Sequence, residues 1–260
     1  MNIFVEASIG AGKSSLLNNL AAKLKDCETL SAVFFKEPTE HWEEILLQFS
    51  KNPKEYAFQT QTHIMTTMHQ QRIDQPAADI RIYERSFLSS QYVFQASLQQ
   101  AGYLTDLECL ILDNLRTTLE KNMPIPDKII YLKLNPSISY ERTKLRNNES
   151  DRLLTMEYFN MIHQKHEEMI ELLIKSGQNV FTVNAEDNQE KVADKVIACI
   201  KQELLPKFKL RWKKNWNEKC KEMSNIADEG IVVIIHFNSF EKKSFADKIG
   251  KESDKDAVCN

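Results

Sequence analysis

The chain begins with residues 1–17, MNIFVEASIGAGKSSLL, in which a short apolar run leads into a glycine-containing loop and then into a run with helical spacing. The loop resembles the pattern G-x-x-x-x-G-K-[ST], the phosphate-binding loop or P-loop that joins a strand to a helix. Gly12, Lys13 and Ser14 match this pattern, but Ala7 replaces its first glycine. Since the chain only leaves the strand at position 7, we expect one methyl group to be tolerated there, whereas Gly12 must let the backbone approach a phosphate.

Glycine is rare in this sequence, which makes the loop stand out. Only six glycines occur in 260 residues, and two of them lie within this loop. Backbone N–H groups and the helix N-terminus would surround a nucleotide phosphate, Lys13 would neutralise its charge, and the Ser14 hydroxyl would bind Mg²⁺. The alternative is a glycine turn without a ligand. The predicted phosphate-binding residues are Ile9, Gly10, Ala11, Gly12, Lys13, Ser14 and Ser15.

Strand-like and helix-like runs alternate along most of the chain. Short apolar runs predict strands at 2–6, 32–36, 80–84, 127–133 and 179–183. Apolar residues at helical spacing predict helices at 14–25, 40–50, 55–72, 86–100, 104–121, 137–146, 155–175 and 188–204. This alternation predicts an α/β fold, a five-stranded parallel sheet with helices on both faces, whose ligands bind beyond the carboxyl ends of the strands.

Composition limits the class of protein. A net charge of −3, with 42% apolar and 27% charged residues, is typical of a globular chain and does not favour extensive nucleic-acid binding. The five cysteines form no CxxC pair, which indicates free thiols in a reducing compartment. No apolar run approaches the ~20 residues of a membrane span, and the first strand leaves no room for a leader. We therefore expect a cytoplasmic protein.

Charged residues follow two further predicted strands. Glu37 comes directly after the second strand, and Glu84 and Arg85 end the third. Taken singly, Glu37 could be a solvated glutamate, and Glu84 and Arg85 could be an ion pair at the surface. Because the carboxyl ends of parallel strands meet at one edge of a sheet, the three residues and the P-loop form a candidate catalytic group.

A fourth polar element follows the fourth strand. Arg142 and Arg146 are four residues apart on a predicted helix, so both point the same way, and the polar stretch RNNESDR comes next. Arginines on such a lid could close over a triphosphate. A solvated basic helix end is the alternative.

These motifs resemble the deoxynucleoside kinase family, which includes deoxycytidine, deoxyguanosine and mitochondrial thymidine kinases and viral members. The resemblance covers about residues 1–205, and its landmarks, in family order, are IGAGKSS, EPTEHW, FQTQT, YERSFLSSQYVF, RTKLRNNESD and MEYFNMIHQKHE. It implies a P-loop kinase fold with a lid segment. It also implies transfer of the ATP γ-phosphate to the 5′-hydroxyl of a deoxynucleoside, with Mg²⁺ as cofactor, in nucleotide salvage.

The resemblance assigns roles to individual residues. Glu37 is similar to the general base that accepts the proton of the 5′-hydroxyl, Arg85 to the arginine that holds this region, and Lys13 completes the catalytic set. Ser14 and Glu84 resemble the Mg²⁺ ligands. The implied nucleoside-binding residues are Trp42, Phe58 and Phe94 as an aromatic cage, Gln59 on the base edge, and Asp151 on the sugar 3′-hydroxyl, while Arg142 and Arg146 resemble the adenine-side and lid arginines.

Three departures from the family pattern affect substrate binding. Asn148 replaces the second lid arginine, although Arg152 lies nearby in the sequence. The family's sugar-binding tyrosine has no clear counterpart, and Phe49 or Tyr56 could take its place. In cytidine- and purine-preferring members an arginine and an aspartate lie beside the base. At these positions this chain has Thr66 and Ser90. We therefore expect a thymidine kinase or a broad deoxypyrimidine kinase.

Other features carry no catalytic assignment. His163 and His166 are spaced for a metal, but without a third ligand we expect them to serve helix packing. Residues 206–260 form a predicted extension with a basic helix at 206–222, a strand-like run and a frayed tail. The helix either docks its tryptophans on the body or presents a surface for a partner, a membrane or nucleic acid. The family resemblance also implies a homodimer built on residues 86–121.

Two other functions fit parts of the sequence. A thymidylate kinase also has Arg-Glu-Pro after its second strand, but Lys36 replaces that arginine and Glu37 would repel a substrate phosphate. A nucleotide-binding module without catalysis is the second alternative, and Lys13, Glu37 and Arg85 argue against it. Phosphorylation assays with deoxynucleosides and with thymidylate distinguish the three functions.

Overall fold

The computed structural model describes residues 1–25, 30–73 and 75–204. Internal contacts divide the chain into the units Met1–Gln202 and Glu203–Asn260. The fold and the cavity described below belong to the first unit. The predicted extension at 206–260, with its basic helix and strand-like run, lies outside the described residues.

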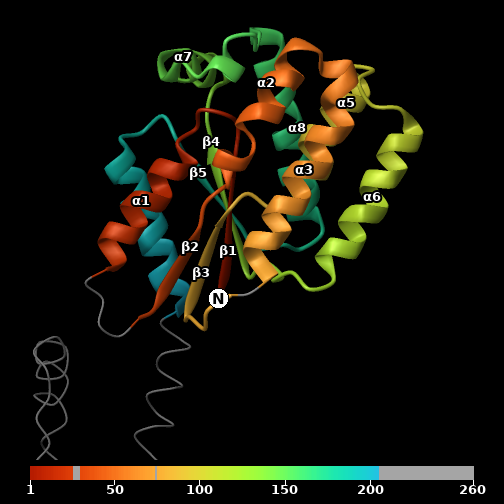
Figure 1. Cartoon of the computed structure of the whole chain (residues 1–260). Helices are drawn as coiled ribbons and strands as arrows, with labels where there is room; N and C mark the ends of the chain where they lie inside the picture. The colour runs from red at the N-terminus through yellow and green to blue at the C-terminus, as the bar shows by residue number, and fades with distance from the viewer. Residues whose placement is uncertain (26–29, 74, 205–260) are drawn as a thin grey trace, which may run out of the picture. The chain divides into compact units, whose positions relative to one another are not determined.

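A single parallel sheet organises the first unit (Figure 1), as the sequence predicts. Its spatial order is β2-β3-β1-β4-β5, so the chain changes direction across the sheet at β1. Ligands in sheets of this kind bind at such a switch point, beyond the carboxyl ends of the strands. The strands are β1 (Asn2–Ala7), β2 (Ala32–Phe35), β3 (Ile80–Glu84), β4 (Lys128–Lys133) and β5 (Val180–Asn184).

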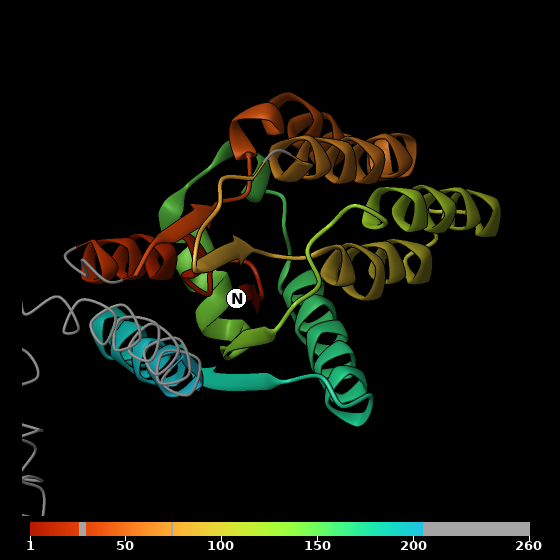
Figure 2. The same ribbon diagram turned by 90° about the horizontal axis from the view of Figure 1, so that it is seen from below.

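Helices cover both faces of the sheet (Figure 2). α1 and the helix that starts at residue 189 lie on one side, and α3, α5, α6 and α8 lie on the other. α2 and α7 lie over the carboxyl ends of the strands. The bounds are α1 (Lys13–Leu24), α2 (Glu43–Lys51), α3 (Pro53–Ile73), α4 (Phe87–Ser89), α5 (Ala96–Gln100), α6 (Asp106–Glu120), α7 (Pro136–Arg146) and α8 (Met156–Lys175), with short 3-10 turns η1 (Thr39–His41) and η3 (Glu149–Asp151).

Burial follows the position of each strand in the sheet. The central strands β1, β3 and β4 are buried along nearly their whole length, whereas the edge strands β2 and β5 are mostly half-buried. Strands covered on both faces need continuous apolar sequence, which explains why the central runs are easy to recognise. Glu6 is the exception in β1, because it is a charged residue in an apolar run; it is fully buried and accepts a hydrogen bond from the Ser86 hydroxyl.

The predicted helix at 86–100 is present, but its middle part is not an α-helix. The structure has a helical run whose middle, η2 (Ser90–Gln95), is a π-helix between α4 and α5. A π turn holds more residues than an α turn, and such segments often occur at functional sites. Ser90 and Phe94, at positions i and i+4 of this segment, both face the cavity described below.

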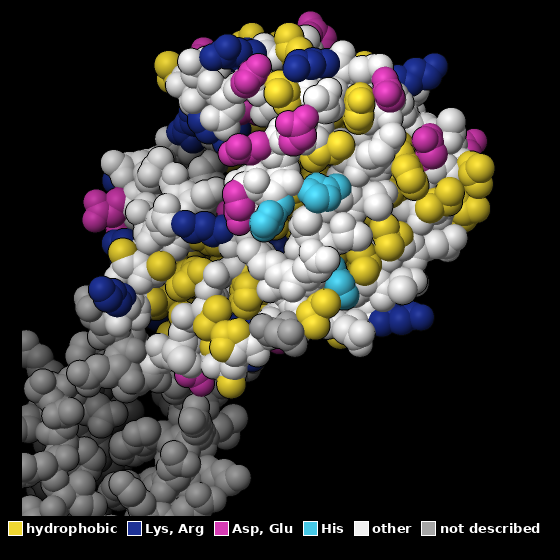
Figure 3. Space-filling view, viewed as in Figure 1, with side chains coloured by type: hydrophobic (Ala, Val, Ile, Leu, Met, Phe, Trp, Pro, Cys, Tyr) yellow, Lys and Arg dark blue, Asp and Glu magenta, His cyan; other side chains and the backbone are white. Residues whose placement is uncertain are grey.

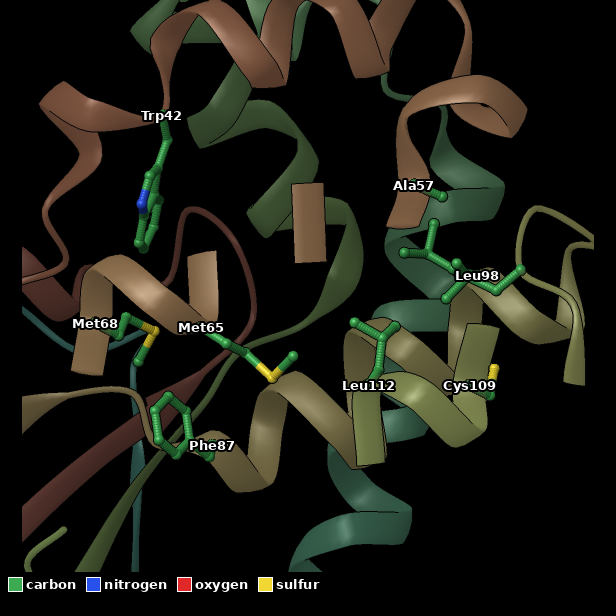
Figure 4. Close-up of a cluster of buried hydrophobic side chains, with 9 residues drawn as sticks. Trp42, Ala57, Met65, Met68, Phe87, Leu98, Cys109 and Leu112 are labelled. Atoms are coloured by element: carbon green, nitrogen blue, oxygen red, sulfur yellow. The ribbon is translucent and has the colours of Figure 1, made fainter. Parts of the chain in front are cut away.

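An apolar cluster fills the space between α3, α4, α5 and α6 (Figure 4). Trp42 points from the start of α2 toward the helix that carries Met65 and Met68, and Leu98 and Leu112 lie at the other end of the cluster. The Trp42 indole Nε1 donates a hydrogen bond of 2.8 Å to Thr67 Oγ1, which fixes the ring. These contacts hold α2 and α3 beside the carboxyl edge of the sheet.

Candidate active site

One large cavity, of about 720 Å³, lies beyond the carboxyl ends of the strands, and its size is typical of a small-ligand site. The P-loop borders it on one side, and apolar residues of α2, α3 and η2 border it on the other. Among the predicted site residues, it is lined by Ile9, Gly10, Gly12, Lys13, Ser14, Ser15, Glu37, Trp42, Glu84, Arg85, Ser90, Phe94, Arg142, Arg146 and Asp151. The predicted residues that do not line it are Ala11, Phe58, Gln59 and Thr66.

The backbone of the P-loop explains which glycines it needs. Gly10 and Gly12 have φ angles of +74° and +90°, in the left-handed region that favours glycine. A Cβ atom on Gly10 would lie 2.5 Å from Thr143 Oγ1, so the loop also packs closely against α7. Ala7 ends β1, is fully buried and does not have a positive φ angle, so alanine is accepted where the P-loop pattern has glycine.

Lys13 is a buried cation at the phosphate side of the cavity. Its Nζ lies 3.5 Å from the backbone oxygen of Ser8, and burial together with the charge of Arg85 lowers its pKa to about 8. Glu37, Glu84 and Glu6 act in the opposite direction. A lysine in this environment gains more from an added anion than an exposed lysine does, because little solvent stabilises its charge.

Ser14 and Glu84 form a pair of oxygen ligands beside Lys13. The Ser14 hydroxyl donates to Glu84 Oε1 at 2.8 Å, and the Glu37 backbone N–H lies 3.4 Å from Glu84 Oε2. Glu84 is buried, and no ion pair joins its carboxylate to a basic side chain in the described part of the chain. A buried carboxylate with a neighbouring hydroxyl fits Mg²⁺, which uses one or two carboxylates together with substrate phosphates.

Glu37 and Arg85 form an ion pair across the ends of β2 and β3. Arg85 Nε lies 2.8 Å from Glu37 Oε1, and the two side chains are 6% and 15% exposed, Arg85 being the more buried. Arg85 Nη1 also donates to the backbone oxygen of Ala7 at 2.9 Å, and the guanidinium carbon lies 4.8 Å from the centre of the Phe94 ring. The pair therefore holds a carboxylate at the cavity wall while one of its oxygens, Oε2, has no partner among the described residues.

The backbone at Arg85 is strained, and Arg72 supports it. Arg85 has a φ angle of +61°, which is rare for a residue with a long side chain. Arg72, buried on α3, donates from Nη2 to the backbone oxygens of Glu84 and Arg85 at 2.8 and 3.1 Å. Burial lowers the pKa of Arg72 to about 10, which leaves it charged at neutral pH. Arg72 is not among the predicted site residues, because a charged residue on a helix usually faces solvent.

The lid segment lies against the cavity through α7 and η3. Arg146 Nη2 donates to Asp151 Oδ2 at 2.6 Å, and Arg142 Nη1 donates to the backbone oxygen of Ala185 at 3.1 Å. Asn148 lines the cavity, whereas Arg152 is exposed and donates to Asn147 Oδ1 at 3.2 Å. The described structure therefore does not bring Arg152 to the place of the family's second lid arginine.

The structure corrects the prediction for the base-binding amide. Gln61, not Gln59, lines the cavity; Gln61 is 6% exposed, and Gln59 is exposed to solvent. Two positions along a helix turn a side chain by about 200°, so the two glutamines point in nearly opposite directions. The Gln61 side chain makes no hydrogen bond within the part of the chain that the structure describes. A buried amide in this state is open to a ligand.

The orientation of α3 also corrects the predictions for Thr66 and Phe58. Thr66 donates its hydroxyl to the backbone oxygens of Thr62 and His63, and Phe58 packs against the apolar cluster beneath α3. In their place, Ile64 and Met68 line the cavity. The spacing of Ala57, Gln61, Ile64 and Met68 marks one face of the helix, and this periodicity is a signal that the sequence contains.

Phe49 and Tyr158 also line the cavity, whereas Tyr56 does not. Tyr158 comes from the first turn of α8, after the N-cap Thr155. Burial raises its pKa to about 12, opposed by the charge of Arg85 and supported by Asp151. The Tyr158 hydroxyl donates no hydrogen bond within the described residues, so a neutral phenol close to Asp151 remains open to a ligand. Tyr158 is a second site residue that the sequence patterns do not indicate.

Two remaining expectations concern thiols and membranes. Cys109 and Cys199 are free and buried. No helix in residues 1–25, 30–73 and 75–204 combines the length and the apolar character that a bilayer crossing needs.

Comparison with known proteins agrees with this geometry. Over 174 residues the chain is 32% identical to a protein of Fowlpox virus named "Probable deoxycytidine kinase", covering 65% of this chain and 71% of that protein. It is 26% identical over 200 residues to the mitochondrial thymidine kinase 2 of Homo sapiens, covering 74% and 73% of the two chains.

A solved structure of deoxyadenosine kinase from M. mycoides, with the products dCMP and a flexible dCDP bound, has the same fold. Its TM-score is 0.68 at 21% identity, over 78% of this chain and 99% of that one. The family model for deoxynucleoside kinase matches residues 3–206, which is most of the chain. This chain therefore belongs to the deoxynucleoside kinase family.

Proposed function

We propose that this kinase transfers the γ-phosphate of ATP to the 5′-hydroxyl of thymidine or, more broadly, of a deoxypyrimidine nucleoside. The observation that carries the proposal is the Glu37–Arg85 pair, which lies in the same cavity as the P-loop. The pair occupies the wall between the phosphate side and the apolar side. A nucleoside whose base lies among the apolar residues therefore presents its sugar to Glu37.

The residues of the pair divide the chemistry between them. Glu37 Oε2 accepts the proton of the 5′-hydroxyl as its oxygen attacks the γ-phosphorus, and the bond to the β–γ bridging oxygen breaks to release ADP. Arg85 Nε holds the other carboxylate oxygen of Glu37. The Nη2 group of Arg85, which has no partner among the described residues, can donate to the reacting oxygens. Lys13 stabilises the charge of the donor phosphates.

The phosphate side of the cavity supports a metal-bound donor. Ser14 and Glu84 would hold Mg²⁺, which supplies charge neutralisation to the β- and γ-phosphates when it is bound. Arg142 would lie beside the donor nucleotide, and Arg146, which pairs with Asp151, would connect the lid to the acceptor. Negative charge develops on the leaving phosphate during the transfer, so cations are needed beside the donor, and the arginines of the lid would provide them.

The preference for a pyrimidine rests on the apolar side of the cavity. Gln61 offers one donor and one acceptor, which match the N3–H and O4 of thymine or, after rotation of the amide, the N3 and amino group of cytosine. Ile64, Met68 and Ser90 are neutral and line the same region. A thymine methyl group against Met68 and Ile64 gains about 0.8 kcal/mol by burial. These four side chains therefore favour thymidine over deoxycytidine but accept both.

Radiolabelled ATP with each of four deoxynucleosides and with thymidylate tests the function. We expect thymidine to give the highest kcat/KM, followed by deoxycytidine, and no product from thymidylate. Product from thymidylate alone would identify a nucleoside monophosphate kinase, and the absence of product from any acceptor would remove the catalytic assignment. A deoxynucleoside monophosphate is a precursor of DNA, so the activity would serve nucleotide salvage in the cytoplasm.

We also propose a homodimer that pairs through α6. Leu107, Leu110 and Ile111 are 66%, 56% and 45% exposed, and their spacing places them on one face of this helix. Hydrophobic side chains gather over α6 in Figure 3, and Tyr92 and Tyr103 are partly exposed on neighbouring segments. Self-pairing of this face would cover it. Sedimentation should give a dimer for the whole protein and a monomer for Leu110→Glu; a wild-type monomer would remove the proposal.

A further inference from the structure

Three of the five hydrogen-bond donors of Arg85 are assigned to protein partners. A guanidinium carries five N–H bonds: one on Nε and two on each terminal nitrogen. Nε meets Glu37, and one Nη1 hydrogen meets the backbone oxygen of Ala7. Nη1 also lies 3.5 Å from Nε2 of His166, so its second hydrogen points to that ring. Only the two hydrogens of Nη2 remain for a ligand.

His166 is a fully buried residue of α8, and its ring is held by a hydrogen bond and by two aromatic contacts. Its Nδ1 lies 2.8 Å from the backbone oxygen of Ile162, an acceptor, so Nδ1 carries the ring proton and Nε2 is left as an acceptor. The ring is nearly parallel to Tyr131 at 6.3 Å and perpendicular to Phe94 at 6.3 Å. Burial, followed by the charge of Arg85, lowers the pKa of His166 well below its usual value, so the ring stays neutral.

We propose that His166 is a positioning residue for phosphoryl transfer, because its Nε2 accepts the second Nη1 hydrogen of Arg85 and fixes the rotation of the guanidinium. With that rotation fixed, Nε meets Glu37 and Nη2 faces the acceptor hydroxyl. The inference rests on the proposed role of Arg85 in the reaction. It assigns a function to a histidine that the sequence indicates only as a packing residue.

Other contacts do not determine this rotation by themselves. The Phe94 ring lies beneath the guanidinium carbon, at 4.8 Å from its centre, and this contact offers no acceptor that would select one rotation. The strained backbone and Arg72 fix the main chain of Arg85, not the end of its side chain. Ala7 provides one acceptor for Nη1. Glu37 provides one acceptor for Nε. The second acceptor for Nη1 comes from another element, α8, and adds a third point at which the guanidinium is held.

Two substitutions separate positioning from packing. His166→Gln keeps an acceptor that reaches toward Arg85 but loses the ring, whereas His166→Phe keeps the ring and its stacking but loses both nitrogens. If His166 only fills space, Phe is the better replacement. If it orients Arg85, Gln is better. His163→Gln and His163→Phe, three positions earlier on the same helix and half-buried, are matched controls.

We expect kcat with ATP and thymidine to fall about 10-fold or more in His166→Phe, because a hydrogen bond to a charged group is lost, and to stay within about 3-fold of wild type in His166→Gln. The KM for thymidine should change less than about 2-fold in both, and the His163 variants should match wild type. A Phe variant that retains wild-type kcat, or that is faster than the Gln variant, would overturn the proposal.

A double-mutant cycle keeps the test valid if His166→Phe is less stable. In an Arg85→Lys background, His166→Phe should lower kcat no further, since the partner that it positions is gone. An equal loss in both backgrounds would show that His166 does not act through Arg85. Thermal melting of each variant gives the folded fraction for normalising kcat. Failure of wild-type enzyme to phosphorylate any deoxynucleoside would instead contradict the proposed function.

Discussion

The two sides of the cavity are built in different ways. On the phosphate side, residues 9–15 form one continuous segment, the P-loop and the first turn of α1, and most of the binding groups are backbone N–H groups whose positions follow from two glycine φ angles. On the nucleoside side, the residues come from α2, α3, η2 and α8, and each is a side chain. Phosphate recognition therefore depends on local backbone conformation, and base recognition depends on the rotation of packed helices.

This contrast predicts different responses to substitution. Residues between the two sides should affect the chemical step, residues on the nucleoside side should affect substrate affinity, and Lys13 should make donor binding depend on pH.

The largest effect is expected for Glu37→Ala, between the two sides. Loss of the general base should lower kcat by about 10³-fold, while thymidine binding is retained because the base pocket is intact. Steady-state kinetics and equilibrium binding measure the two quantities separately. Glu40→Ala, an exposed carboxylate of η1, is the control. Near-normal turnover in Glu37→Ala would remove its assignment as the base.

The nucleoside side is tested by a pair of glutamines on α3. Gln61→Ala should raise the KM for thymidine about 10- to 100-fold, because a base buried without its amide partner loses about 1–3 kcal/mol. Gln59→Ala, two residues earlier and exposed, should change KM less than about 2-fold, as surface substitutions rarely alter a distant pocket. The reverse result would mean that the rotation of α3 differs from the one described.

The phosphate side should respond to pH through Lys13. Its pKa of about 8 in the ligand-free protein means that the ammonium loses its proton as the pH rises above 8. Only the charged form attracts a triphosphate, so ATP affinity should fall about 10-fold for each pH unit above that value. Lys13→Arg, charged at every accessible pH, should bind ATP with little dependence on pH. Wild-type affinity that stays constant up to about 1.5 pH units above the pKa would contradict the shift.

The smallest effect is expected at Tyr158. If its hydroxyl meets the sugar 3′-hydroxyl beside Asp151, Tyr158→Phe should raise the KM for thymidine about 5- to 10-fold, the worth of one hydrogen bond. The same variant should use the analogue 3′-deoxythymidine as well as the wild-type enzyme does, because that substrate lacks the partner hydroxyl. Tyr56→Phe, away from the cavity, is the control. An equal loss with both substrates would assign Tyr158 to packing.

Much of the molecule could be predicted from the sequence. The five parallel strands, the order of the helices and the P-loop follow from apolar runs, helical spacing and rare glycines. Glu37, Glu84 and Arg85 could be found because strand ends in a parallel sheet meet at one edge. The π-helix at Ser90–Gln95 could not, since a segment of six residues is too short for the phase shift of one extra residue to be recognised in the apolar pattern.

The sequence by itself determined the fold class, the phosphate loop and the charged residues at the strand ends, because these depend on local conformation and on the common direction of the strands. Only the tertiary structure decided that Gln61 and Met68, not Gln59 and Thr66, face the cavity, and that Arg72 and His166 lie within hydrogen-bond distance of Arg85. The physical reason is that the rotation of a helix against its neighbours is set by packing over its whole length, and a shift of two residues reverses the side that it presents.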